Sequence, residues 1–150
     1  MDKSSIQILE ENVDSVNLSL KRLVYSYHVC NKIKLDSEYS DDEFVAFEAM
    51  AARFARTTDI LVNKVLRSLD VVEYVEPGTV IDAANNAEKR GIGNARDIRT
   101  LKELRNSIAH EYVAERVVLF FGKVLECTPM LISIVDNVNK YCKKYLAEES

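Results

Sequence analysis

The sequence predicts an all-α protein, folded as an antiparallel up-down bundle of four to five helices. Three long segments carry apolar residues at alternating steps of three and four, which is the spacing of one helix face. No segment shows the polar and apolar alternation of a β-strand. Only 4 Gly and 2 Pro interrupt 150 residues, which favours long helices. A chain of this length fits one domain, so residues 1–150 are expected to form a single domain.

The first predicted helix covers residues 6–30. Ser4 is followed three residues later by Gln7, the pattern of a capping box, in which two free backbone N–H groups are satisfied by side chains. Behind this start, apolar side chains recur in steps of three and four. They are Ile6, Leu9, Val13, Val16, Leu20, Leu23, Tyr27 and Cys30. Such a stripe predicts that one face of the helix packs against neighbouring helices.

The second predicted helix begins after a loop at residues 36–39. Ser40 and Glu43 form another capping box at its start. The three-and-four spacing then repeats, and it predicts that the helix continues to about Asp70. The stripe consists of Phe44, Phe47, Ala51, Phe54, Thr58, Leu61 and Val65.

Two shorter helices are expected after a Glu-Pro-Gly turn at residues 76–78. Thr79 with Asp82 predicts the start of the third helix, and the glycines within 91–93 end it. Asn94 is the expected N-cap of the fourth helix. The core face of this fourth helix consists of Leu101, Leu104 and Ile108.

The C-terminal part of the chain is expected to form two helical segments. A helical pattern runs from Ala114 to about Glu126. Thr128 then has the character of an N-cap, and Pro129 would take the first helical position, where its missing N–H costs nothing. The last apolar stripe consists of Leu131, Ile134, Val138, Tyr141 and Tyr145. The sequence therefore predicts a new helix start at Thr128.

Composition and charge exclude several classes of protein. The net charge of −4 argues against a protein that coats nucleic acid non-specifically. Six basic residues nevertheless face two acidic ones between Lys89 and Arg105, which suits either a phosphate-bearing ligand or a solvated helix face. No signal peptide and no apolar run of membrane-spanning length occur, so a cytoplasmic protein without membrane association is expected. The three cysteines lie far apart, and we expect buried thiols, no metal site and no cofactor.

The segment with the most chemistry is Arg-Asn-Ser-Ile-Ala-His-Glu-Tyr at residues 105–112, at the end of the fourth helix. Arg105 offers a planar guanidinium for phosphate, and His110 exchanges protons near neutral pH. Tyr112 offers a hydroxyl that can be modified. Asn106 either orients the phosphate or His110, or simply caps a turn. Together these are the parts of a phosphodiester-cleaving site.

Helical geometry indicates that one chain holds only half of such a site. Arg105 and Tyr112 are seven residues apart and share a stripe, whereas His110 lies about 140° round the helix from Arg105. Arg105 and His110 converge if the helix bends or ends near Ala109, or if two copies of the chain meet. Phosphodiester transesterification also needs both a base and an acid, and the other histidine, His28, lies in a different helix and is expected to be structural. A C2 dimer would supply two copies of each motif residue.

The motif resembles the signature of HEPN domains, in particular of HepT-type toxins. That signature is an arginine, a polar residue, three further residues, a histidine, any residue and a tyrosine. Arg105, Asn106, His110 and Tyr112 match it position by position. The resemblance extends more loosely over most of the chain. It implies an all-helical homodimer with facing motifs, acting as a metal-independent endoribonuclease in which Arg105 and His110 are catalytic and Asn106 supports them.

The resemblance also implies that the protein is the toxin of a type VII-like toxin–antitoxin pair. In this family the antitoxin is a minimal nucleotidyltransferase that transfers AMP to the tyrosine of the motif, here Tyr112. A phosphate group added beside His110 and Arg105 would neutralise the arginine and repel RNA. The RNA contacts expected from the basic strip are Arg96, Arg99 and Lys102.

Two other functions are compatible with the same residues. The bundle could present the cleft of Arg105 and His110 to a nucleotide, or to a nucleotidyltransferase partner, without catalysing a reaction. It could also be a helical dimerisation domain in which the motif is coincidental. RNA cleavage that depends on Arg105 and His110 separates the first hypothesis from these two.

Overall fold

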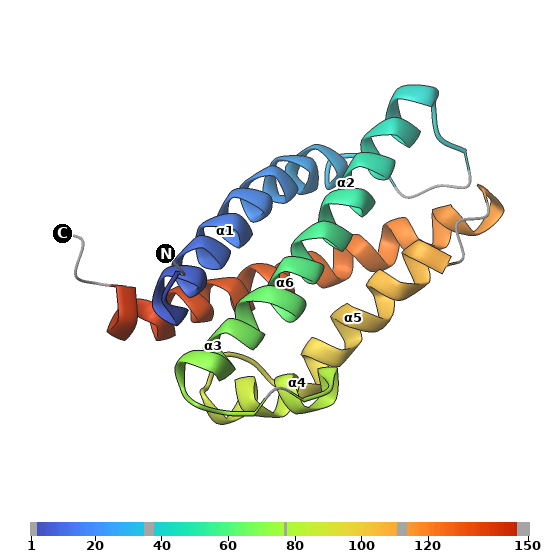
Figure 1. Cartoon of the computed structure of the whole chain (residues 1–150). Helices are drawn as coiled ribbons and strands as arrows, with labels where there is room; N and C mark the ends of the chain where they lie inside the picture. The colour runs from blue at the N-terminus through green and yellow to red at the C-terminus, as the bar shows by residue number, and fades with distance from the viewer. Residues whose placement is uncertain (1–2, 35–37, 77, 111–113, 147–150) are drawn as a thin grey trace.

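The computed structural model describes residues 3–34, 38–76, 78–110 and 114–146. In the last of these ranges, side chains are described from residue 119 onward. All regular structure in these residues is helical, so the predicted all-α class is confirmed (Figure 1). The elements are α1 (Ser5–Cys30), α2 (Asp41–Asp59), the π-helix η1 (Ile60–Val65), α3 (Leu66–Val72), α4 (Val80–Lys89), α5 (Ala95–His110) and α6 (Ala114–Leu146). None of these helices is both long and apolar enough to cross a lipid bilayer.

Local sequence signals determine where the helices begin. Ser4, Ser40 and Thr79 each accept a hydrogen bond from the backbone N–H three residues later, and the side chain at that later position accepts from the N–H of the cap. All three predicted capping boxes are thus confirmed. At the start of α5, Asn94 Oδ1 accepts a hydrogen bond of 2.8 Å from the N–H of Arg96, which confirms Asn94 as the N-cap.

The predicted second helix is confirmed in extent, but α2, η1 and α3 follow one another as one helix with a π-helical middle. In η1 the backbone hydrogen bonds close over one extra residue per turn. The apolar pattern explains this widening, because buried side chains recur in steps of four. They are Leu61, Val62, Val65, Leu66 and Leu69. Each step of four turns an ideal α-helix about 40° past a full circle, so the wider π turn keeps these side chains facing the core.

α6 is one continuous helix of 33 residues, so the predicted new start at Thr128 is wrong. Pro129 lies inside the helix, where its missing N–H leaves the carbonyl of Leu125 without the usual partner. Thr128 is buried, and its Oγ1 donates a 2.6 Å hydrogen bond to the carbonyl of Val124 instead of capping a new helix. Apolar residues on both sides of the proline belong to the core, and their packing outweighs the lost hydrogen bond.

The core lies where α1, α2 and α6 meet. α1 packs along α2, α6 packs against both, and α5 packs against α2 and α6 (Figure 1). The rings of Phe47 and Phe121 are stacked at 4.6 Å between centroids, and Phe44 meets Phe121 edge-on. Most of the predicted α1 stripe is buried, but Ile6 in the first turn is 42% exposed.

A polar cluster joins the end of α3 to α4 and α6. Glu73 accepts hydrogen bonds from Arg90 Nε at 2.6 Å and from the hydroxyls of Tyr141 and Tyr145. Arg90 also pairs with Asp70 at 2.8 Å, and both of these side chains are buried. Burial alone would raise the pKa of Glu73, but the three hydrogen bonds and the charge of Arg90 lower it to about 2. The bond to Glu73 in turn raises the pKa of Tyr145 to about 12.

Candidate functional site

Arg105 is held on the side of α5 that meets the end of α2. The buried side chains of Leu104 and Ile108 anchor α5 in the core and so set the direction of Arg105. Its Nε lies 2.7 Å from Asp59 Oδ1, and the two side chains are 29% and 31% exposed. The Nε–H does not point at an acceptor, so this contact is an ion pair without an aligned hydrogen bond. Arg105 Nη1 makes a long hydrogen bond of 3.5 Å to Asn106 Oδ1.

Asp59 is shared by two residues of the predicted basic strip. Lys102 Nζ lies 3.5 Å from the Oδ1 atom that contacts Arg105, and Lys102 precedes Arg105 by three residues on α5. Lys102, an expected RNA contact, therefore joins α5 to α2 within the chain. Arg96 and Arg99, the other two expected RNA contacts, are exposed. Because two cations share one carboxylate, this part of α5 keeps a net positive charge.

The other described motif residues lie toward the end of α5. His110 is its last residue and is exposed, and Asn106 is also exposed. Because α5 is helical through His110, the five-residue separation places His110 about 140° round the helix from Arg105. The two side chains therefore diverge within one chain. Tyr112, the expected modification site, lies outside the described residues.

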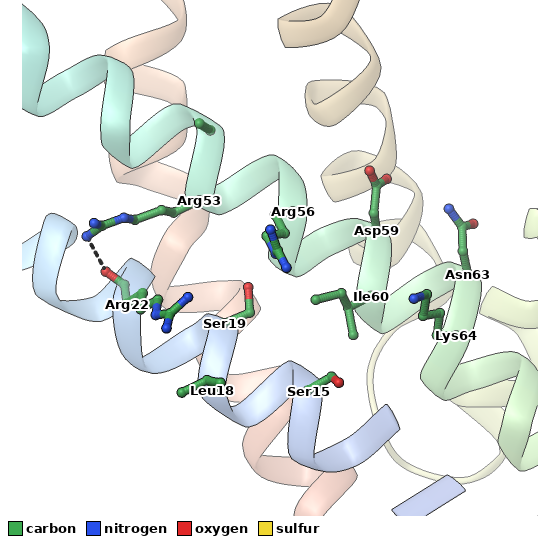
Figure 2. Close-up of a pocket in the computed structure, with 11 residues that line it drawn as sticks. Ser15, Leu18, Ser19, Arg22, Arg53, Arg56, Asp59, Ile60, Asn63 and Lys64 are labelled. Atoms are coloured by element: carbon green, nitrogen blue, oxygen red, sulfur yellow. Dashed lines mark hydrogen bonds between the residues drawn. The ribbon is translucent and has the colours of Figure 1, made fainter. Parts of the chain in front are cut away.

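A groove of about 910 Å³ lies between α1 and the α2–η1 segment (Figure 2). Sequence reasoning missed it, because its lining comes from two helices and belongs to no recognised motif. Its charged side chains are Arg22 from α1 and Arg53, Arg56, Asp59 and Lys64 from α2 and η1. Figure 2 shows that Arg56 points toward α1, whereas Asp59 points away from α1. Asp59 thus lies at the border between the groove and the basic side chains of Lys102 and Arg105.

The groove has an excess of positive charge, with four basic side chains and one acidic side chain in its lining. Arg53 Nη1 donates hydrogen bonds to the carbonyl of Arg22 at 3.1 Å and to Ser26 Oγ at 2.9 Å, which fix its guanidinium against α1 (Figure 2). Among the described residues, no carboxylate forms an ion pair with Arg22, Arg53, Arg56 or Lys64. The groove is therefore suited to an anionic ligand.

Groups suited to proton transfer or nucleophilic attack are few. His28, the second histidine, is exposed near the end of α1, with its ring centroid 5.8 Å from that of Tyr27. Cys30 and Cys142 are buried as expected, and burial raises the pKa of each thiol to about 11, so neither is a nucleophile at neutral pH. The described part of the chain holds no group of three or more His, Cys, Asp or Glu side chains placed to bind a metal ion.

Comparisons of this chain with protein-family models, with curated proteins and with solved structures found no match.

Proposed function

We propose that this protein is a metal-independent endoribonuclease of the HEPN type, the toxin of a type VII-like pair with a minimal nucleotidyltransferase as antitoxin. The observation that carries the proposal is the Arg-Asn-x3-His motif at the end of α5. His110 is exposed there, and the partly exposed guanidinium of Arg105 is oriented by Asp59. The position of the motif in an all-helical fold supports the resemblance to the HEPN signature.

The chemistry assigns a separate step to each side chain. A neutral His110 removes the proton from a ribose 2′-hydroxyl, whose oxygen then forms a bond to the adjacent phosphorus. A protonated His110 gives its proton to the 5′-oxygen that leaves, so the products are a 2′,3′-cyclic phosphate and a 5′-hydroxyl. Arg105 holds the non-bridging oxygens while negative charge builds up on them.

Asp59 acts as a positioning residue, because it orients the guanidinium of Arg105. Its carboxylate takes the Nε side of the guanidinium at 2.7 Å. The Nη atoms then remain for a bidentate contact with phosphate, apart from the long bond to Asn106. Asn106, exposed next to Arg105, contacts the same phosphate in this proposal.

A homodimer supplies the second proton-transfer group. Since His110 and Arg105 diverge on α5, one chain cannot direct both at one phosphate. A C2 axis near the end of α5 places His110 of one chain opposite Arg105 of the other and provides a base and an acid together.

Modification of Tyr112 is the proposed off switch. The antitoxin transfers AMP from ATP: a bond forms between the tyrosine oxygen and the α-phosphorus, and pyrophosphate leaves. The added phosphodiester carries negative charge two residues from His110, where it competes with RNA for Arg105.

Two substitutions test the ribonuclease proposal. His110→Ala and Arg105→Ala should each lower the rate of RNA cleavage by about 10²–10⁴-fold, because each removes a group that acts in the transition state. His28→Ala is the matched control and should cleave as the wild type does, because His28 lies on α1 and not on the helix that carries the motif. Thermal melting and gel filtration establish that the variants stay folded. Equal cleavage by the wild type and both motif variants would show the proposal to be wrong.

Mixed dimers test the shared site. A heterodimer of one His110→Ala chain and one wild-type chain keeps a single histidine. If the base and the acid are the two copies of His110, this heterodimer cleaves RNA as slowly as the His110→Ala homodimer does. If each chain cleaves alone, dilution to monomer leaves the activity per chain unchanged, and the dimer proposal fails.

A non-catalytic module is the second candidate, in which the motif binds a nucleotide or a nucleotidyltransferase partner. The two cations Lys102 and Arg105, which share the single carboxylate of Asp59, favour it, because an anion such as ATP can bind to this excess of positive charge without any reaction. Purified protein that leaves RNA intact at high concentration, yet binds ATP in an Arg105-dependent manner, would establish this function instead.

A further inference from the structure

We propose that the groove between α1 and the α2–η1 segment binds the phosphate backbone of single-stranded RNA. This inference rests on the proposed function, since it names where the substrate lies outside the cleavage motif. It concerns a surface that shares no residue with the motif at 105–112.

The charge of the groove favours a ligand with several negative charges. Four basic side chains and one acidic side chain line it. The acidic one, Asp59, already contacts Lys102 and Arg105 on the neighbouring helix. The groove cations are therefore available to an external anion, and Arg53 is held in place for one by its bonds to α1.

The spacing of the cations favours a polymer over a single nucleotide. Arg53, Arg56 and Lys64 follow one another along the same helix, and at 1.5 Å per residue the row extends about 16 Å. One strand of a duplex places a phosphate about every 3.4 Å along the helix axis, and consecutive phosphates of a single strand lie further apart, so the row spans more than one phosphate. One nucleotide would reach only part of it.

The uncharged lining favours contact with the backbone and not with bases. Leu18, Ala52 and Ile60 contribute the apolar surface, and none of the described residues that line the groove is aromatic. Sites that grip bases of single strands use aromatic rings as stacking platforms. Without such rings, affinity comes from phosphates, and little preference for sequence is expected.

The position of Asp59 links the groove to the cleavage motif. Asp59 borders the groove on one side of its helix and contacts Arg105 on the other. A strand that lies on Arg53, Arg56 and Lys64 therefore passes the element that positions the catalytic arginine. The groove would hold the RNA on one side of the cleaved bond.

The test measures binding of an uncleavable RNA, a short single-stranded oligonucleotide with 2′-O-methyl riboses, by fluorescence anisotropy. The variant Arg22→Glu/Arg56→Glu reverses two exposed cations of the groove. The control Lys21→Glu/Lys143→Glu makes the same change of charge at exposed lysines outside it. The groove variant should bind at least about tenfold more weakly, and the slope of log K against log salt should fall by roughly 1.4, about 0.7 for each lost phosphate contact. The control should bind as the wild type does.

Three outcomes would overturn the inference. One is equal RNA affinity of the groove variant and the control. Another is AMP binding as tight as that of the oligonucleotide through the same residues, which makes the groove a nucleotide site. The third is equally tight binding of polyglutamate, or of anionic phospholipid vesicles, which makes the groove a docking surface for an acidic protein or a membrane.

Failure of this inference can be told apart from failure of the proposed function. His110→Ala should lose cleavage and keep full affinity for the uncleavable RNA, whereas the groove variant should show a raised KM for cleavage. If the wild type cleaves no RNA but binds it through Arg22 and Arg56, the ribonuclease proposal fails and the inference that the groove binds RNA is supported. If the groove variant cleaves RNA with an unchanged KM, the groove inference fails and the ribonuclease proposal is supported.

Discussion

Arg105 Nε lies 2.7 Å from Asp59 Oδ1, so the arginine of the motif is tied to the residue that ends α2 and precedes the π-helix. Lys102 contacts the same carboxylate oxygen at 3.5 Å. π-Helical segments occur frequently at functional sites, and here one adjoins the carboxylate that holds the candidate catalytic arginine. A change in η1 can therefore alter the position of Arg105 without touching α5.

The ion pair between Asp59 and Arg105 should contribute measurably to stability. We expect a double-mutant cycle of Asp59→Asn and Arg105→Gln to give a coupling energy of about 1 kcal/mol, the upper end for partly exposed pairs. The control is the i,i+4 pair of Asp136 and Lys140 on α6, which is more exposed and should give at most about 0.5 kcal/mol. Urea denaturation measures both. A coupling near zero for the first pair would show that Asp59 does not hold Arg105 in solution.

Glu73 should make the stability depend on acid pH. Its pKa of about 2 lies below its ordinary value of 4.5, so the ionised form stabilises the folded protein fully above about pH 4.5. This contribution is lost as the pH falls toward 2. Glu73→Gln should cost on the order of 2 kcal/mol at pH 7, because charged hydrogen bonds to two tyrosines and Arg90 are weakened.

The measurement for Glu73 is urea denaturation of the wild type and Glu73→Gln between about pH 2.5 and about pH 7, from just above the folded pKa of about 2 to well above the ordinary value of 4.5. The stability gap between them should narrow below about pH 4.5. Glu103→Gln, a change at an exposed residue of α5, is the control and should leave the wild-type pH profile nearly unchanged. A gap that stays constant with pH would contradict the lowered pKa.

Tyr74 sits in a backbone conformation that suits glycine. Its φ is 58°, its side chain is 97% exposed, and the N–H groups of Tyr74 and Val75 bond to the carbonyls of Val71 and Asp70 in a Schellman arrangement. Tyr74→Gly should raise the free energy of unfolding by about 1 kcal/mol, because it removes left-handed strain and loses no packing.

Gly91 provides a comparison for Tyr74, because both residues have a positive φ at the end of a helix. It ends α4 with φ 73° in the same hydrogen-bond pattern, and a Cβ there would meet no atom within 4 Å. Gly91→Ala should therefore lower stability by about 1 kcal/mol through backbone strain alone. Thermal melting of both variants checks the pair. Destabilisation by Tyr74→Gly would show that the tyrosine has a contact that offsets its strain.

Pro129 should lower the stability of α6. Pro129→Ala restores a donor for the carbonyl of Leu125 and removes a ring that clashes with the preceding turn, so we expect about 1–3 kcal/mol of added stability. Ser133→Ala, at an exposed position one turn later, is the control and should add no more than about 0.5 kcal/mol. Equal melting temperatures for the two variants would mean that the core requires the distortion imposed by the proline.

Much of the fold could be predicted because helix signals are local. A capping box involves residues three positions apart, and Ser4, Ser40 and Thr79 all act as their neighbours indicate. Thr128 shows the limit of local reasoning. Threonine followed by proline is typical of a helix start, yet burial of Thr128 and of the apolar residues around it keeps α6 continuous. Tertiary packing outweighed the local signal there.

The candidate site, like the fold, has features that could be predicted from the sequence and features that could not. The motif of Arg105, Asn106 and His110 and its place at the end of a helix could be predicted, because they follow from residue identity and helical period along the chain. The contact of Asp59 with Arg105, and the groove lined by cations of α1 and α2, could not be predicted. Those pairings join residues on separate helices, and their partners are chosen by how the apolar faces pack and not by any local pattern.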